Sequence, residues 1–266
     1  MAQNILERII ERKQQEVKTT QSLMPEYKLE KTTGFFSREV LSFSQNIVDI
    51  NKSGIIAEHK RQSPSKGIIN AQVTLPEVVI GYQKANASAI SVLTDKDFFG
   101  GSNEDLIKAR ALVQIPILRK DFIISEYQIL EAKAIGADAI LLIAAVLKPA
   151  KLNSLAAYAK ELGMEVLMEV HNLEELERSL NDYIDVVGVN NRNLKDFSES
   201  IETSIQLAEA IPNKYVKISE SSISKAETIL TLKQYGYQGF LIGETFMKQT
   251  NPGLACSQLA EEIKFK

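Results

Sequence analysis

The chain places a dense group of chemically active side chains directly after a short apolar stretch. Gly54 to Ala57 are small or apolar and are typical of a short buried strand, and Glu58, Lys60 and Arg61 follow at once. Charged groups against a buried strand lose hydration, so they need partners or a task. The segment therefore indicates either a solvated strand end with an incidental charge cluster or one edge of a reactive site.

The arrangement recurs along the chain, which favours the reactive site. Short apolar runs repeatedly end in polar residues: Arg119, Lys120 and Asp121; Glu169; Asn190 and Arg192; Glu220 and Ser221; Gly243 and Glu244. Lysines that share a cavity with several carboxylates alter one another's proton affinity and suit general acid–base catalysis. Each polar strand end alone is more typical of a structural ion pair, and only their convergence makes a site.

The apolar runs predict the element that would bring these side chains together. Eight runs rich in Val, Ile and Leu mostly lack alternation, which is typical of parallel strands buried on both faces. They occupy residues 54–57, 89–94, 115–118, 139–146, 165–168, 186–189, 215–218 and 240–242. Segments with helical periodicity lie between them, at 75–85, 127–135, 152–162, 173–180, 201–211 and 225–235.

Strand and helix alternating eight times predict a (β/α)8 TIM barrel, whose strands all point their C-terminal ends at one mouth. A doubly wound open sheet is the alternative, but it would normally have fewer strands, and the chain lacks a Gly-x-Gly-x-x-Gly turn. We expect one barrel domain over residues 1–266, with residues 1–50 as an N-terminal helical extension packed on it. Ile5, Leu6, Ile9 and Ile10 form the apolar stripe of its first helix, expected to reach about Lys18, and residues 35–43 carry a second apolar piece. A dimerisation arm is the alternative for this extension.

Composition excludes several classes of function. The chain has 31 basic and 34 acidic residues and a net charge of −3, which offers no electrostatic basis for binding nucleic acid or an anionic membrane. The longest apolar run is too short to span a bilayer, and the N-terminus lacks a signal-peptide core. Cys256 stands alone, so no intrachain disulfide can form, and a cytoplasmic, reducing location is expected.

Metal and nucleophile chemistry find little support in the sequence. His59 and His171 have no partner at metal-ligand spacing, and a single cysteine cannot supply a thiolate cluster, so we expect no metal. On a strand, the side chain of His59 should point away from those of its neighbours, which predicts a packing role. Cys256 is expected to be inert core. The loops after the seventh and eighth runs, with Gly243, instead suggest a phosphate-binding cradle at the cationic mouth.

Taken together, these motifs resemble the indole-3-glycerol phosphate synthase family. The resemblance runs from about residue 4 to the end in unchanged motif order, and it is most specific in Glu-x-Lys-Arg-x-Ser-Pro-Ser and Lys-Asp-Phe. The matching segments are Ile56–Ser65, Ser91–Asp95, Pro116–Phe122, Glu169, Gly188–Leu194, Ser219–Ser221 and Leu241–Met247. The chain ends after one barrel, so it resembles the monofunctional form.

The resemblance implies a carbon–carbon lyase of tryptophan biosynthesis. The family cyclises 1-(2-carboxyphenylamino)-1-deoxyribulose 5-phosphate to indole-3-glycerol phosphate, with loss of CO2 and water and without a cofactor. It implies Lys120 as general acid and Lys60 close by to hold the substrate. Glu169 and Glu58 are the implied candidates for the dehydration step, and Asn190 and Glu220 are implied to orient them. Which carboxylate serves which step stays open, and so does association with other enzymes of the pathway; a monomer is expected.

The resemblance also implies a set of binding residues. Arg192 would meet the anthranilate carboxylate, since a planar guanidinium pairs well with a planar carboxylate. The remaining substrate-binding residues would be Phe98 and Phe122 at the aryl ring and Ser63 in the covering loop, and those at the phosphate would be Ser221, Ser222, Gly243, Glu244 and Arg61. One departure concerns Ser222, where the family usually has glycine, because serine tolerates a positive φ less well.

Two other functions stay open from the residues themselves. Another phosphosugar barrel enzyme, such as a phosphoribosylanthranilate isomerase, would be expected to carry a cysteine base on the first strand, which this chain lacks. A non-catalytic metabolite-binding barrel would have little reason to keep two lysines and two carboxylates in matching places.

Overall fold

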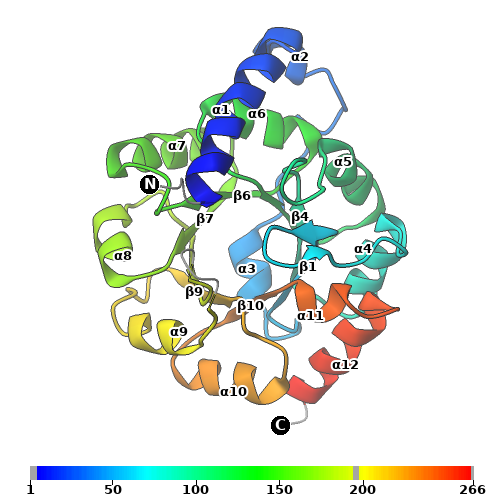
Figure 1. The fold of residues 1–266 in the computed structure, drawn as a ribbon, viewed down its shortest axis with the longest axis vertical. Helices are drawn as coiled ribbons and strands as arrows, with labels where there is room; N and C mark the ends of the chain where they lie inside the picture. Colours follow the sequence, from blue (N-terminus) through cyan, green and yellow to red (C-terminus); the bar gives the residue numbers. More distant parts are fainter. Residues whose placement is uncertain (1–4, 194–197, 265–266) are drawn as a thin grey trace.

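The computed structural model describes residues 5–193 and 198–264 (Figure 1). Within these residues, parallel strands close into a barrel in the order β1-β10-β9-β8-β7-β6-β5-β4. The strands are β1 Ile55–His59, β4 Ala89–Leu93, β5 Ile117–Lys120, β6 Ala139–Ile143, β7 Glu165–Val170, β8 Val186–Asn190, β9 Val216–Glu220 and β10 Gly239–Ile242. A (β/α)8 barrel is therefore confirmed, and the open-sheet alternative is wrong, because β1 pairs with β10 as well as with β4.

Helices surround the barrel in the intervals between strands (Figure 1). They are α4 Leu75–Lys84, α5 Asn103–Leu112, α6 Glu126–Ile135, α7 Pro149–Glu161, α8 Leu173–Ser179, α9 Glu202–Leu207, α10 Ala226–Gln234, α11 Glu244–Met247 and α12 Pro252–Lys264. Local sequence sets their ends: Thr74 and Glu77 form a reciprocal capping box at α4, and Gly136 closes α6 in the left-handed conformation. A short hairpin of β2 Gln62–Ser63 and β3 Gly67–Ile68 follows β1.

The strands divide their side chains between two apolar clusters. Ile55 and Ala57 of β1 pack outward with the helices, whereas Ile56 packs inside the barrel. The same alternation places Glu58 inside and His59 outside, because successive side chains of a strand point to opposite faces. Every residue of β1 is nevertheless buried, which explains why the sequence pattern does not alternate.

The described part of the segment before β1, which starts at residue 5, holds three helices: α1 Ile5–Leu23, α2 Glu26–Leu29 and α3 Phe43–Val48. In Figure 1, α1 runs across the barrel face near α6, and α3 is seen through the barrel centre. Phe43 and Ile47 of α3 are fully buried within the inner cluster, where Gly239 leaves room for Ile47. The first helix extends five residues beyond the expected Lys18, and the second apolar piece becomes helical only at its last residue, Phe43. The start of the extension lies outside the described residues.

Candidate active site

A cavity of about 650 Å3 lies where the C-terminal ends of the strands meet. The expected site residues that line it are Glu58, Lys60, Ser63, Lys120, Phe122, Glu169, Asn190, Arg192, Glu220, Ser221, Ser222, Gly243 and Glu244. Inward strand positions supply its floor: Leu118 and Leu167 belong to the inner cluster, and two residues further along each strand stand Lys120 and Glu169. Most of the expected site residues therefore border one cavity, and their roles stay predictions.

Two lysines and three carboxylates form the centre of the cavity, and we refer to Glu58, Lys60, Lys120, Glu169 and Glu220 as the lysine–carboxylate cluster. Lys120 Nζ lies 2.6 Å from Glu220 Oε2 and 3.4 Å from Glu169 Oε2. Lys60 Nζ lies 2.8 Å from Glu58 Oε1. Because the carboxylates outnumber the lysines by one, the cluster carries a surplus negative charge when all five groups are ionised.

The pKa values of the cluster follow from this balance. Burial opposes the charge of Lys120, but Glu220, Glu169 and Glu58 outweigh it and raise the pKa of the ammonium. Burial also disfavours ionised Glu58 and Glu169, yet the nearby cations, Lys120 above all for Glu169, lower the pKa of both. Glu220 is the carboxylate that loses its charge most easily, because burial and then the charge of Glu169 raise its pKa to about 7. Near neutral pH the cluster thus offers an ammonium donor, two ionised carboxylates and one carboxyl poised between its two forms.

Polar neighbours hold the carboxylates in place. Asn190 Nδ2 donates to Glu169 Oε1 over 3.2 Å, and Ser91 Oγ donates to Glu58 Oε2 over 3.4 Å. Gly243 is required for the position of Glu58, because a Cβ at this position would overlap Glu58 Oε1. That contact is closer than real Cβ atoms come to a neighbour, so any side chain at 243 would displace the carboxylate.

The turns after β9 and β10 border the cavity next to the lysine–carboxylate cluster, and their role in binding phosphate stays a prediction. Ser221 and Ser222 both adopt positive φ, +66° and +59°, so the turn after β9 takes the left-handed conformation that glycine favours. Ser222 Oγ donates to Glu199 Oε2 over 3.2 Å. The backbone of this turn and of Gly243 borders the same cavity.

Arg192 lines the cavity while bound to carboxylates of the protein. Its guanidinium pairs with Glu199, lies 3.6 Å from Glu244 Oε2, and donates to Ser65 Oγ over 2.5 Å. Ser65 belongs to the loop between β2 and β3. Arg192 therefore ties that loop to the β8 side of the mouth, and a substrate carboxylate would have to share or replace these acidic partners.

Three expectations about the mouth are wrong. Phe98 does not line the cavity in the described chain; its neighbour Phe99 does, with its ring centroid 5.9 Å from that of Phe122. Arg61 points away from the cavity, because its guanidinium binds Asp105 and the carbonyl of Gly100. The side chain of Arg119 also points outward, where it pairs with Glu131 and Asp121. Its neighbours on β5, Leu118 and Lys120, point inward, so Arg119 must point to the other face.

Sequence reasoning also missed His171, which follows β7. Its Nε2 lies 3.3 Å from Glu169 Oε1, and its Nδ1 lies 3.1 Å from Glu175 Oε2. Burial opposes the imidazolium, but the contact with Glu175 and the charge of Glu169 raise the pKa of His171 above its ordinary value. The i, i+4 spacing of His171 and Glu175 beside Glu169 was the available signal.

The two remaining reactive groups lie away from the cavity. His59 is buried on the outer face of β1, and burial lowers its pKa to about 4. Cys256 is buried in α12, and burial raises its pKa to about 12. Residues 5–193 and 198–264 contain no group of three or more His, Cys, Asp or Glu side chains arranged to hold a metal ion, and no helix among them is long and apolar enough to cross a membrane.

Comparison with known proteins shows the family of the chain. The family model described as indole-3-glycerol phosphate synthase matches residues 6–259. The chain belongs to this family. The indole-3-glycerol phosphate synthase of Bacteroides thetaiotaomicron is 52% identical over 212 residues, which are 80% of this chain and 81% of that protein. The Bordetella pertussis protein of the same name is 40% identical over 259 residues, or 96% of this chain and 98% of that protein.

A solved structure shows the fold in a distant protein. The structure named "Native KDPGal structure" has a TM-score of 0.56 and 13% identity, and it covers 79% of this chain and 92% of that chain. At this identity the likeness concerns the barrel alone. The resemblance drawn from the sequence motifs is thus confirmed at the level of the family.

Proposed function

We propose that the protein is an indole-3-glycerol phosphate synthase of tryptophan biosynthesis. The reaction converts 1-(2-carboxyphenylamino)-1-deoxyribulose 5-phosphate into indole-3-glycerol phosphate, CO2 and water. The observation that carries the proposal is the position of Lys120, an ammonium at the cavity floor held 2.6 Å from Glu220 and 3.4 Å from Glu169. A fixed buried cation is what a carbonyl oxygen needs as negative charge develops on it.

Ring closure uses Lys120 as the general acid. The aryl carbon that bears the carboxylate attacks the ketone carbon, and the carbonyl oxygen takes a proton from Lys120 Nζ. Loss of CO2 returns its bonding electrons to the ring, so the protein has no electron sink to supply. Lys60, paired with Glu58 over 2.8 Å, lies on the same face of the mouth and would hold the substrate's charge.

Dehydration then removes the new hydroxyl as water and a proton from the ring system. Glu58 and Glu169 are suited to accept that proton, because the pKa of each is lowered and both are ionised at neutral pH. Asn190 orients Glu169 through its amide, and Glu220 holds Lys120. The departing hydroxyl takes a proton from an acid of the lysine–carboxylate cluster. Because a carboxylate leaves as neutral CO2, the overall reaction consumes one proton, so the proton gained by the glutamate and one proton from solvent restore the ammonium of Lys120 and complete the cycle without a cofactor in this proposal.

The remaining residues would bind the substrate. Ser221, Ser222, Gly243 and Glu244 would offer backbone N–H groups to the phosphate, and Lys66, whose Nζ lies 3.6 Å from Glu244 Oε1, adds a nearby cation. The apolar end, with Phe99 and Phe122, would take the aryl ring. Arg192 would recognise the anthranilate carboxylate, and Ser63 would belong to the covering loop.

We also propose a monomeric, cytoplasmic enzyme made of a single barrel domain. In support, the N-terminal extension packs on its own barrel: Leu29 joins an apolar cluster with Tyr127 and Leu130 of α6. An arm kept free for a partner would leave such side chains exposed.

An indole-fluorescence assay with the purified protein and the carboxyphenylamino-deoxyribulose phosphate tests the activity. We expect turnover that EDTA leaves unchanged, and loss of about 10²–10⁴ in kcat for Lys120→Met, the usual contribution of general acid–base catalysis. Glu58→Gln should lose activity on a similar scale. Cys256→Ser serves as the control, since Cys256 lies in α12 outside the cavity.

Four outcomes would contradict the proposal. Wild-type rates in both active-site variants would remove the assigned roles, and inhibition by EDTA would remove the metal-free mechanism. Absence of indole product from a protein that binds the substrate would favour a non-catalytic barrel, and formation of the substrate from phosphoribosylanthranilate would favour the isomerase.

A further inference from the structure

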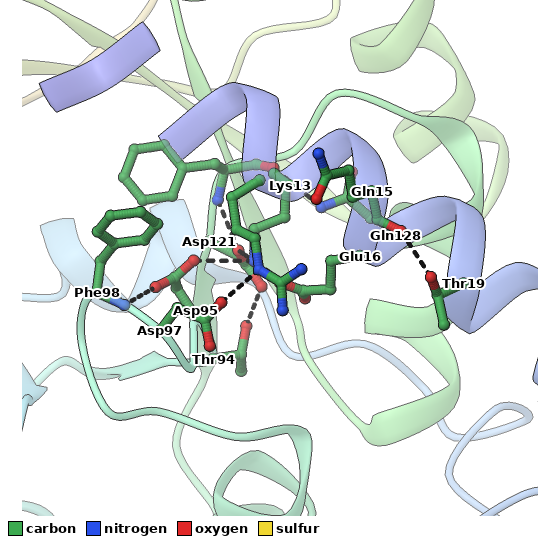
Figure 2. Close-up of polar contacts among 12 residues, drawn as sticks. Lys13, Gln15, Glu16, Thr19, Thr94, Asp95, Asp97, Phe98, Asp121 and Gln128 are labelled. Carbon is green, nitrogen blue, oxygen red and sulfur yellow. Dashed lines mark hydrogen bonds and ion pairs between the residues drawn. The ribbon is translucent and has the colours of Figure 1, made fainter. Parts of the chain in front are cut away.

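A buried lysine outside the lysine–carboxylate cluster joins the N-terminal helix to the active-site mouth (Figure 2). The side chain of Lys13, on α1, is only 1% exposed. Its Nζ lies 2.9 Å from Asp121 Oδ1, 3.0 Å from Asp95 Oδ2 and 3.0 Å from Glu16 Oε2. Taking an ammonium out of water is costly unless close partners compensate it, and here three carboxylates do so. Such a site holds Lys13 in one place.

The partners of Lys13 belong to the C-terminal ends of two barrel strands. Asp95 follows β4 by two residues, and Asp121 directly follows Lys120 at the end of β5. Asp121 Oδ1 also accepts from the backbone N–H of Phe122 over 2.8 Å, and its Oδ2 accepts from Thr94 Oγ1 over 2.5 Å. Lys13 is therefore one contact away from the backbone of Phe122, whose side chain lines the cavity.

The helix that carries Lys13 is itself part of the cavity wall. Ile5, Leu6 and Ile9 of α1 line the cavity beside Phe122. Ile9 and Lys13 are four residues apart, so they lie on the same face of the helix, one turn from each other. The ion pairs of Lys13 with the strand ends consequently hold α1 with its Ile5, Leu6 and Ile9 side chains facing the cavity.

We propose that Lys13 is a positioning residue for the reaction. It holds the wall of Ile5, Leu6 and Ile9, and through Asp121 the backbone of Phe122, against the bound substrate. The proposal rests on the proposed function of the site. Its main effect falls on substrate binding rather than on proton transfer, because the partners that hold Lys120 are Glu220 and Glu169, which Lys13 does not contact.

The decisive comparison is between Lys13→Met and Arg12→Met. Arg12 is the adjacent cation of α1 and pairs with Asp97 over 2.5 Å, but that pair is exposed, and exposed pairs contribute little. We expect Lys13→Met to raise KM at least about tenfold, the change produced by about 1.4 kcal/mol of lost binding, while kcat stays within about threefold. Arg12→Met should leave both constants within about twofold.

Two further variants separate positioning from simple loss of stability. Lys13→Arg keeps the cation, so its KM should lie close to that of the wild-type protein. The double variant Lys13→Met with Asp95→Asn removes one cation and one carboxylate, so it should unfold at a higher temperature than Lys13→Met alone yet keep the raised KM. Titration with indole-3-glycerol phosphate gives a readout without turnover, and its Kd should rise in parallel with KM.

An unchanged KM in Lys13→Met, a fall of kcat at constant KM, or recovery of KM in the double variant would overturn the inference. Failure of the wild-type protein to form any indole product would instead overturn the proposed function. The ratio of product Kd values between wild type and Lys13→Met would still test the role of Lys13 in that case.

Discussion

Glu220→Gln should change how the stability of the protein depends on pH. Burial and the charge of Glu169 raise the pKa of Glu220 from its ordinary 4.5 to about 7. The folded protein then binds a proton at Glu220 more tightly than the unfolded chain does. The resulting stabilisation is fully present below pH 4.5 and is lost as the pH rises through about 7. Glutamine cannot titrate, so the variant should lack this loss.

The expected size follows from the displacement of the pKa. One pKa unit corresponds to about 1.4 kcal/mol, so a change from 4.5 to about 7 amounts to roughly 3 kcal/mol for this fully buried carboxyl. Urea denaturation of both proteins from about pH 5 to about pH 8.5 measures it. The free energy of unfolding of Glu220→Gln, relative to wild type, should rise by up to that amount across the range.

Two controls make the test specific. Glu161→Gln removes an exposed carboxylate at the end of α7, outside the cavity, and should leave the wild-type pH dependence in place. Glu169→Gln removes the second cause of the raised pKa and should reduce the effect of Glu220. A constant difference between wild type and Glu220→Gln at every pH would refute the surplus charge assigned to the cluster.

Two more predictions concern the neighbours of this cluster. Ser222→Gly relieves a φ of +59°, so we expect up to about 1 kcal/mol of added stability, or about 2–4 °C in Tm by calorimetry, and a Kd for inorganic phosphate within about threefold of wild type. A lower Tm would show that the Ser222–Glu199 hydrogen bond matters more than the backbone conformation. His171→Gln removes a cation beside Glu169, so the pKa of Glu169 should rise and the acid limb of kcat/KM should move to higher pH. The same variant loses the stability that the raised pKa of His171 provides below about pH 6.5 and that fades at higher pH; an unmoved acid limb would contradict this role.

The sequence was most informative for residues on the buried strands, where successive side chains point alternately into and out of the barrel. Each inward strand position is set by the period of two, so Lys120 and Glu169 could be assigned to one cavity once eight parallel strands were recognised. Strand ends were less certain: the expected third strand ended at Leu118, whereas β5 reaches Lys120. Polar residues at the C-terminal end of a strand resemble loop residues in the sequence, although in β5 they continue the strand.

Loop residues escaped prediction because their contacts depend on distant partners. Phe98 and Phe99 are adjacent in the sequence, so only the turn that contains them determines which ring faces the cavity. In this turn, Asp95 accepts a hydrogen bond from the backbone N–H of Phe98. Arg61 binds Asp105, which lies 44 residues further along the chain. Lys13 was hidden in the same way, since an ordinary charged helix position gives no sign that two strand ends will enclose it.

The N-terminal segment has a consequence for the order of events during synthesis. Its anchors all emerge from the ribosome after it: Lys13 waits for Asp121, Arg38 Nη2 binds Asp138 over 2.6 Å, and Ser42 Oγ binds Glu165 over 2.6 Å. Contacts of such long sequence separation form slowly, because the intervening chain must first be ordered. The part of the chain made first is therefore expected to dock late, and the apolar stripe of α1 stays exposed to chaperones at least until Asp121 has been made.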